Sequence, residues 1–78
     1  MPTLRFFAQA RDAAGVSSAL HDGATVGQTL DAAVAAYGDG FAEVLAASKV
    51  WRNGEPTERD EPVSDGDEIA VLPPVSGG

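Results

Sequence analysis

The chain has 78 residues and no cysteine, so it supports one small domain and excludes disulfides, thiolate metal sites and thiol catalysis. Its 44% apolar content is typical of a globular protein rather than a disordered one. Twelve acidic and five basic residues give a net charge of −7, which disfavours nucleic acid and anionic membranes as partners. The charge favours a protein partner with a basic docking face; the alternative is that it serves only to keep the protein soluble.

The first segments of the chain predict a β-hairpin. Alternating side chains indicate a strand over residues 3–8, with every second residue toward the core. Phe7 falls on the opposite, polar face, where it is either covered by the C-terminal segment or exposed as a partner contact. Residues 11–15 are expected to form a loop, and residues 16–20 a second, weaker strand.

One clear helix follows the hairpin. Thr25 with Gln28 three residues later matches a capping box. Apolar residues then recur at helical spacing on one face of the helix: Val26, Leu30, Ala33, Val34 and Tyr37. Gly38 is expected to end this helix in a left-handed conformation, with Gly40 as a further break. Residues 41–47 are expected to form a short second helical turn.

The remainder of the chain predicts two further strands and an edge segment. Residues 49–53 read as a strand that ends at the Asn53-Gly54 turn. The polar stretch 55–62 holds two prolines and is expected to add only a short edge segment. A second turn at residues 65–67 leads into the last strand, residues 68–72.

This order of elements predicts an α+β domain. A single amphipathic helix buries its apolar stripe against one face of a sheet, which gives two layers. With the first and last strands side by side in parallel, the fold is a ubiquitin-like β-grasp, a mixed sheet of four to five strands packed on one main helix. We expect this domain to span residues 1–72, followed by an extended, flexible C-terminal tail over residues 73–78.

The C-terminal sequence Leu72-Pro73-Pro74-Val75-Ser76-Gly77-Gly78, which is the end of the last strand followed by the tail, is the most informative segment. A terminal Gly-Gly has no Cβ atoms, so it can enter a channel too narrow for other residue pairs and present the α-carboxylate at its end. The two prolines favour an extended backbone, and six extended residues reach about 20 Å. A frayed terminus without a function is the alternative.

Other candidate sites in the chain are weak. His21, the only histidine, has no neighbouring nucleophile and is expected to be a solvated surface residue. Asp65, Asp67 and Glu68 fit a turn with solvated charges better than a calcium loop, whose ligands span twelve residues. No serine has a neighbouring base and no glycine-rich phosphate loop is present, so we expect no bound metal or cofactor and no catalysis by the chain alone.

The segments FFAQARDAAG and DGDEIAVLPPVSGG, with the helix between them, resemble the MoaD family, the small sulfur-carrier subunit of molybdopterin synthase. This resemblance implies that Gly78 cycles between carboxylate, acyl-adenylate and thiocarboxylate, with Gly77 as the slim residue before it. It implies three protein partners, namely an E1-like enzyme that consumes ATP to adenylate Gly78, a sulfur donor protein, and the large synthase subunit in a heterotetramer. In that complex, two carriers loaded with sulfur supply the sulfur atoms that convert the cyclic pyranopterin precursor into the dithiolene of molybdopterin.

The resemblance assigns the remaining site residues to partner binding. Phe7 and Leu72 match positions of the family's hydrophobic docking surface, which accounts for the outward Phe7. The inserting arm consists of Pro73, Pro74, Val75 and Ser76. Some relatives carry aromatic residues where this chain has an aliphatic pair at residues 71–72; Leu72 can fill a similar pocket, and a different pocket in the partner stays open.

Two other classes of function stay open. A related carrier that serves thiazole synthesis for thiamine (the ThiS type), or a ubiquitin-like modifier that tags protein lysines, shares the Gly-Gly end. Thiamine-type carriers generally lack the Pro-Pro-Val lead. A binding module that docks non-covalently through its β-face would instead tolerate a residue appended after Gly78.

The distribution of charge and the start of the chain carry two further expectations. Five acidic residues precede or open the last strand and are expected near the tail, where they would guide the encounter with a basic partner: Asp60, Glu61, Asp65, Asp67 and Glu68. Residues 1–20 lack the basic start and apolar block of a signal peptide, and no apolar run approaches the length of a membrane span. A cytoplasmic location is therefore expected.

Overall fold

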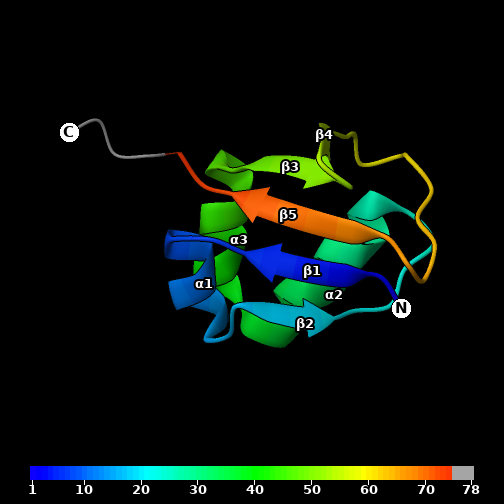
Figure 1. Ribbon diagram of the computed structural model, residues 1–78. Helices are drawn as coiled ribbons and strands as arrows, with labels where there is room; N and C mark the ends of the chain where they lie inside the picture. The colour runs from blue at the N-terminus through cyan, green and yellow to red at the C-terminus, as the bar shows by residue number, and fades with distance from the viewer. Residues whose placement is uncertain (75–78) are drawn as a thin grey trace.

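The fold is a five-stranded mixed sheet with helices on one face (Figure 1). The structure, a computed structural model, describes residues 1–74, so the predicted tail residues Val75, Ser76, Gly77 and Gly78 lie outside the described residues. Its elements in chain order are β1 (Thr3–Phe6), α1 (Gln9–Ala14), β2 (Ser18–Leu20), α2 (Val26–Tyr37), α3 (Asp39–Ala47), β3 (Lys49–Arg52), β4 (Glu55–Pro56) and β5 (Glu68–Leu72).

The strand order confirms the predicted β-grasp. Within the described residues the order is β2-β1-β5-β3-β4, with β1 and β5 parallel and each other neighbouring pair antiparallel. The first and last strands therefore lie side by side at the centre of the sheet. The chain continues from β5 into Pro73 and Pro74, neither of which belongs to a strand.

The main helix, α2, begins and ends where the sequence predicts. Oγ1 of Thr25 accepts a hydrogen bond from the backbone N of Gln28 at 3.1 Å, and Gln28 Oε1 accepts one from the backbone N of Ala24 at 2.9 Å. The second bond serves the residue before the cap, which makes this a variant of the capping box. The helix ends because Gly38 adopts φ 92° and ψ −168°, a region essentially reserved for glycine. The predicted left-handed helical conformation of Gly38 is wrong, because its φ is positive as expected but its ψ lies far from the left-handed helical value.

Two helices differ from the expectation. Most of the predicted loop at residues 11–15 belongs to α1, whose Ala10 is fully buried in the core. A helix of six residues is not stable by propensity alone, so its sequence gives little sign of it before packing is known. α3 starts at Asp39 rather than at residue 41, and Gly40 lies in its first turn instead of breaking it.

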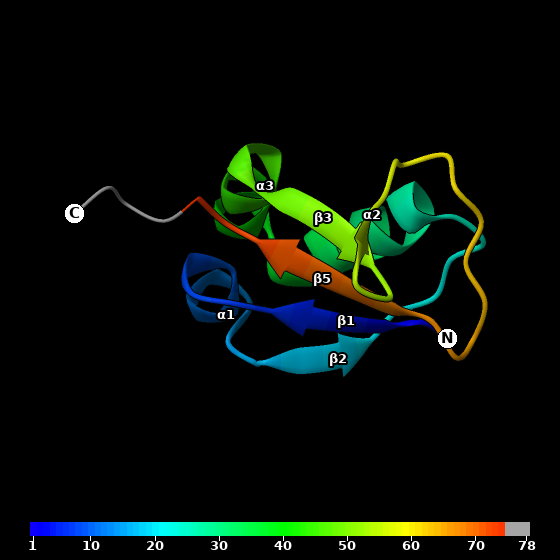
Figure 2. The same ribbon diagram turned by 45° about the horizontal axis from the view of Figure 1, so that its top comes forward.

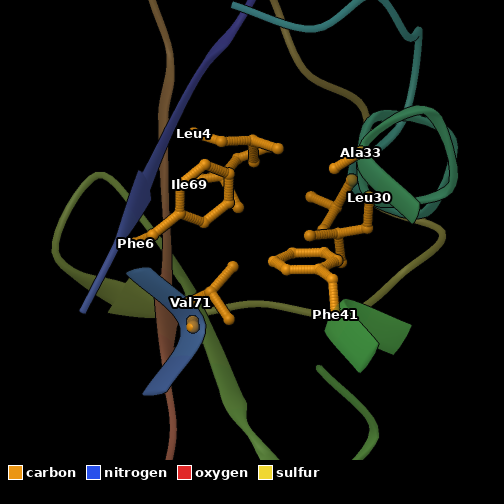
Figure 3. Close-up of a cluster of buried hydrophobic side chains, with 9 residues drawn as sticks. Leu4, Phe6, Leu30, Ala33, Phe41, Ile69 and Val71 are labelled. Carbon is orange, nitrogen blue, oxygen red and sulfur yellow. The ribbon is translucent and has the colours of Figure 1, made fainter. Parts of the chain in front are cut away.

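The core lies between the sheet and the helices. It combines strand residues Leu4, Phe6, Ile69 and Val71 with helix residues Leu30, Ala33 and Phe41 (Figure 3). Phe41 is fully buried, and its ring meets that of Phe6 edge to face at a centroid distance of 5.4 Å. Burial of each large apolar side chain stabilises the fold by about 1.5–3 kcal/mol. The inner face of the sheet is therefore used for folding, and the outer face is the one that a partner can reach.

The strand register brings three residues together at one end of the sheet. Phe6 lies beside Val71 in the last pair of the parallel ladder β1·β5, and continuing this register by one residue brings Phe7 next to Leu72. Leu72 also pairs with Lys49 across the antiparallel pair β3·β5. This end, where β1 and β5 finish and β3 begins, lies on the left in Figures 1 and 2, close to α1. We call it the tail end, because the chain leaves β5 there, and we call the opposite end the far end.

Candidate functional site

The outer face of the sheet carries an apolar strip that begins at the tail end. The side chain of Phe7 is 40% exposed, and the guanidinium carbon of Arg5 lies 5.8 Å from its ring centroid. Leu72 is half-buried next to it. Ala70 and Trp51, which pair with each other across β5 and β3, continue the strip and are also half-buried. These four apolar residues, Phe7, Leu72, Ala70 and Trp51, have the mixture of aromatic and aliphatic surface that protein partners bury.

A strained backbone turn fixes the position of Phe7. Phe6 is buried, so strand alternation turns Phe7 toward the outer face. Ala8 then adopts φ 50° and ψ −122°, and the chain enters α1 with a hydrogen bond of 3.0 Å from the backbone N of Ala10 to the carbonyl of Phe7. A positive φ is uncommon for a residue with a Cβ atom, and such strain concentrates at functional sites. The turn holds Phe7 beside the point where the tail leaves β5.

A groove of about 370 Å³ lies at this same point. It is lined by Ala47, Lys49, Leu72, Pro73 and Pro74. Pro73 is half-buried and Pro74 is exposed. Because a proline has no backbone N–H for a sheet ladder, the two prolines mark the place where the chain departs from the sheet. The predicted sites at residues 75–78 lie outside the described residues, and the partner-binding role of Phe7, Leu72 and the two prolines stays a prediction.

The acidic residues expected near the tail lie at the far end instead. Glu68 opens β5 and Leu72 closes it, so the cluster that precedes Glu68 is separated from the tail by the length of the strand, about 13 Å. Figure 1 shows the segment between β4 and β5 at the same end of the molecule as the N-terminus. The expected placement is wrong because an acidic run before a strand lies at the start of that strand, whereas the tail leaves from its end.

Several of these carboxylates are engaged locally. The guanidinium of Arg52 lies 3.1 Å from a Glu61 carboxylate oxygen and 3.7 Å from one of Asp67. The Asn53 side chain donates to Asp67 at 3.0 Å, and this bond, together with one from the backbone N of Ser64, holds the pKa of Asp67 below its ordinary value. These contacts close the turn before β5 and account for the acidic cluster without a bound cation.

His21 is half-buried rather than solvated, and it serves the fold. Its Nε2 lies 2.8 Å from the hydroxyl oxygen of Tyr37, and the two rings meet edge to face at a centroid distance of 5.3 Å. Burial lowers the pKa of His21 and raises the pKa of Tyr37. The pair ties the segment after β2 to the end of α2. The sequence prediction of a solvated His21 is therefore wrong.

The described part of the chain contains no arrangement of three or more His, Asp or Glu side chains suited to a metal ion. Within the same residues, no helix has the length and apolar character that crossing a bilayer requires. The apolar strip and the groove at the tail end of the sheet form the candidate site.

Comparison with known proteins shows the family to which the chain belongs. A family model described as "ThiS family" matches residues 4–78. Small archaeal modifier protein 1 of Haloferax volcanii is 44% identical over 63 residues, an alignment that covers 70% of this chain and 71% of that protein. The crystal structure of the Haloferax protein superposes with a TM-score of 0.87 at 35% identity, covering 99% of this chain and 98% of the other.

Two solved structures link the fold to molybdopterin converting factors. A putative subunit 1 from Pyrococcus furiosus superposes with a TM-score of 0.79 at 28% identity, covering 95% of this chain and 97% of that one. A chain from the complex of subunits 1 and 2 of the Helicobacter pylori factor gives a TM-score of 0.71 at 26% identity, with coverage of 99% and 97%. The chain therefore belongs to the ThiS family, as a ubiquitin-like β-grasp sulfur carrier or modifier of the ThiS/MoaD type.

Proposed function

We propose that this chain carries sulfur to the dithiolene of molybdopterin. In this proposal the large subunit of molybdopterin synthase binds the apolar strip and receives the adjoining tail in its own active site. The observation that carries the proposal is the end of the β1·β5 ladder at Phe6 and Val71, from which the two strands continue to the exposed Phe7 and to Leu72, where the tail begins. A partner that covers Phe7 and Leu72 is placed within reach of Gly78, since six extended residues span about 20 Å. The likeness to subunit 1 of the Pyrococcus factor, and to a chain from the complex of subunits 1 and 2 of the Helicobacter factor, supports the same assignment.

The chemistry at Gly78 proceeds through an activated acyl group. The α-carboxylate attacks the α-phosphate of ATP in an E1-like enzyme, which releases pyrophosphate and leaves an acyl-adenylate. Sulfide sulfur from a donor protein then attacks the carbonyl carbon, and the C–O bond to phosphate breaks. AMP departs, and Gly78 becomes a thiocarboxylate. This chain acts as a substrate throughout, and Gly77 contributes by having no side chain to obstruct either active site. The absence of cysteine means that no internal thiol competes for the activated carbonyl.

Covalent tagging of other proteins is the second candidate. It is favoured by the 44% identity to a protein whose name describes it as a modifier. In this reaction the adenylated Gly78 is attacked by a lysine amine of a target protein, which forms an amide bond and releases AMP. Both candidates need the same activated terminus, so they differ only in the nucleophile that attacks the carbonyl carbon of adenylated Gly78.

Reconstitution tests the first candidate and the need for a free Gly78. The thiocarboxylated chain, mixed with the large synthase subunit of its own organism and the cyclic pyranopterin precursor, should give molybdopterin, consuming two carriers for each product. A matched chain with one residue appended after Gly78 should fold normally and give none, because the activated group would be displaced from the tip. Full activity of the extended chain would rule out both covalent candidates and favour a non-covalent binding module.

Deletion of the gene in its own host provides an independent test. The molybdopterin assignment predicts loss of molybdenum enzyme activity with normal growth in the absence of thiamine. A requirement for thiamine with intact molybdenum enzymes would instead assign the carrier to thiazole synthesis. Loss of protein conjugates with neither defect would leave protein tagging as its function.

A further inference from the structure

The chain offers few groups that can attack an activated carbonyl. It has no cysteine, and Lys49 is its only lysine, because the other four basic residues are arginines. An arginine guanidinium stays protonated in proteins, whereas a lysine amine becomes a nucleophile once it loses a proton. The only other amine is the N-terminal ammonium, which lies 2.6 Å from a carboxylate oxygen of Asp65. Lys49 and the N-terminus are therefore the two places at which an amide bond between two copies of this chain can form.

Lys49 lies where the tail leaves the sheet. It is the exposed first residue of β3 and pairs with Leu72, the last residue of β5. Directly opposed residues of an antiparallel pair project on the same face, so the two side chains are neighbours on the outer face. The ion pairs of residues 1–74 involve Arg5, Arg52, Arg59 and the N-terminus, and none of them occupies the amine of Lys49. The N-terminus lies at the far end (Figure 2).

The groove at this place suits the tail of a second copy. Its lining consists of Ala47, Leu72 and the two prolines, with Lys49 as the single charged residue. The C-terminal segment is apolar through its Pro-Pro-Val sequence and ends in a carboxylate, or in an acyl phosphate when adenylated. The chain as a whole carries seven excess negative charges, so Lys49 gives an anionic terminus a favourable contact on an otherwise repelling surface.

From this placement we propose that Lys49 is the acceptor to which the activated Gly78 of a second copy becomes joined by an amide bond. The proposal rests on the adenylation of Gly78 that the proposed function requires. The neutral Nζ attacks the Gly78 carbonyl carbon, a C–N bond forms, the C–O bond to phosphate breaks, AMP leaves, and the amine proton passes to water. ATP supplies the activation. Each added copy brings its own Lys49, and the contact is head-to-tail, so the product can grow beyond two copies.

The donor is a second copy because the chain's own tail begins next to Lys49. Pro73 and Pro74 line the same groove as Lys49, and their fixed φ favours an extended rather than a reversed backbone at this point. A second copy is not covalently attached at this point, so its C-terminal segment can approach the groove in the orientation that the reaction needs. An intramolecular amide would have the mass of one chain less one water, whereas the proposed product has the mass of two chains less one water.

The test uses the purified chain with Mg²⁺-ATP and the adenylating enzyme of its own organism. We expect a two-copy product in which trypsin, whose last cleavage site is Arg59, leaves residues 60–78 attached to Lys49 within the peptide 12–52. Lys49→Arg keeps the charge and removes the nucleophile, and it should lower the two-copy product at least tenfold. Activation of Gly78, measured as pyrophosphate release and as the hydroxamate formed with hydroxylamine, should be the same in both proteins.

A repositioned lysine tests the role of the groove. Arg11 is exposed on α1, close to the tail end but outside the groove, so the double variant Lys49→Arg/Arg11→Lys restores an amine there without restoring the site. We expect this double variant to form no two-copy product. Conjugation at residue 11, at the N-terminus, or within a single copy would overturn the proposal. Normal activation without any two-copy product would overturn it and leave the proposed function intact, whereas absence of activation would overturn both.

Discussion

Phe7 and Leu20 form a matched pair of exposed apolar side chains on the outer face of the sheet. Phe7 lies beside Leu72 at the tail end, whereas Leu20 pairs with Thr3 at the far end and is 61% exposed. Aromatic anchors at interface centres typically cost about 2 kcal/mol or more on truncation. We therefore expect Phe7→Ala to weaken binding of the large synthase subunit at least tenfold, as measured by titration calorimetry, and Leu20→Ala to have little effect.

The same two variants separate docking from folding. Both side chains are partly solvated, so neither truncation should change the melting temperature by more than a few degrees. A large drop in melting temperature for Phe7→Ala, with unchanged affinity, would place Phe7 in the core rather than at an interface. Equal losses of affinity in the two variants would contradict the assignment of docking to the tail end.

Ala8 stores backbone strain next to Phe7, and glycine should release it. A residue in such a conformation costs about 1–3 kcal/mol, while glycine adds about 0.5–1 kcal/mol of backbone entropy on folding. Ala8→Gly is therefore expected to raise the free energy of unfolding by about 1 kcal/mol in a urea titration. A loss of stability would show that the conformation of Ala8 is not strained, and that another interaction sets the direction of Phe7.

At the scale of elements, the His21–Tyr37 contact predicts how stability depends on pH. Burial lowers the pKa of folded His21 below the ordinary value of 6.5. Between the folded and unfolded pKa values the unfolded chain binds more protons, so stability increases with pH in that window. The free energy of unfolding should be fully retained above about pH 6.5 and should decrease as the pH is lowered through and below this value.

His21→Gln provides the control for this pH dependence. Glutamine keeps a polar side chain at this position but does not titrate, so the variant should be less stable at neutral pH and have a flatter profile. Urea titrations at about pH 7.5 and 5.5 compare the two proteins in the range where histidine is the titrating side chain. Equal slopes would show that other groups, such as carboxylates, cause the acid sensitivity.

Local signals in the sequence were sufficient for the elements that they control. Thr25 caps α2, and Asn53 with φ 52° followed by Gly54 with φ 85° makes the predicted turn after β3. α1 and the early start of α3 could not be predicted in the same way. These short helices are stabilised mainly by packing against each other and the core, which a reading of local propensity does not include.

The candidate site was predictable only in part, for a related reason. Phe7 stood out because it breaks the alternation of its own strand. Lys49, Trp51 and Ala70 were missed as members of the site, because cross-strand register decides which residues share a row of the sheet, and register between distant strands is not visible in local sequence. The acidic cluster was misplaced for a different reason: it precedes β5 and the tail follows β5, so the length of the strand separates them.

At the scale of the whole molecule, the two ends of the sheet differ in character. The apolar strip and Lys49 lie at the tail end, and the acidic turn before β5 lies at the far end. A partner that docks on the outer face is then held by apolar contacts near the tail and guided by charge from the other end. We expect the rate of association to fall steeply with added salt and the rate of dissociation to stay nearly constant.

Stopped-flow association with the large subunit, measured across a salt series, tests whether charge guides the encounter while apolar contacts hold the complex. Surface charges are screened beyond about 8 Å at physiological ionic strength, so most of the effect should appear below that salt concentration. A flat association rate would show that the net charge of −7 serves solubility alone. A salt-dependent dissociation rate would show that ion pairs, rather than the apolar strip, hold the complex.

The central claim is that Gly78 carries the sulfur, and mass spectrometry tests it most directly. Protein isolated from its own host and digested with trypsin should contain residues 60–78 in two forms, one of them heavier by the exchange of one carboxyl oxygen for sulfur. The mass shift should be localised to the C-terminal residue and should be absent when the host expresses a chain lacking Gly78. A single unmodified C-terminal peptide from host cells that are actively making molybdopterin would contradict the account.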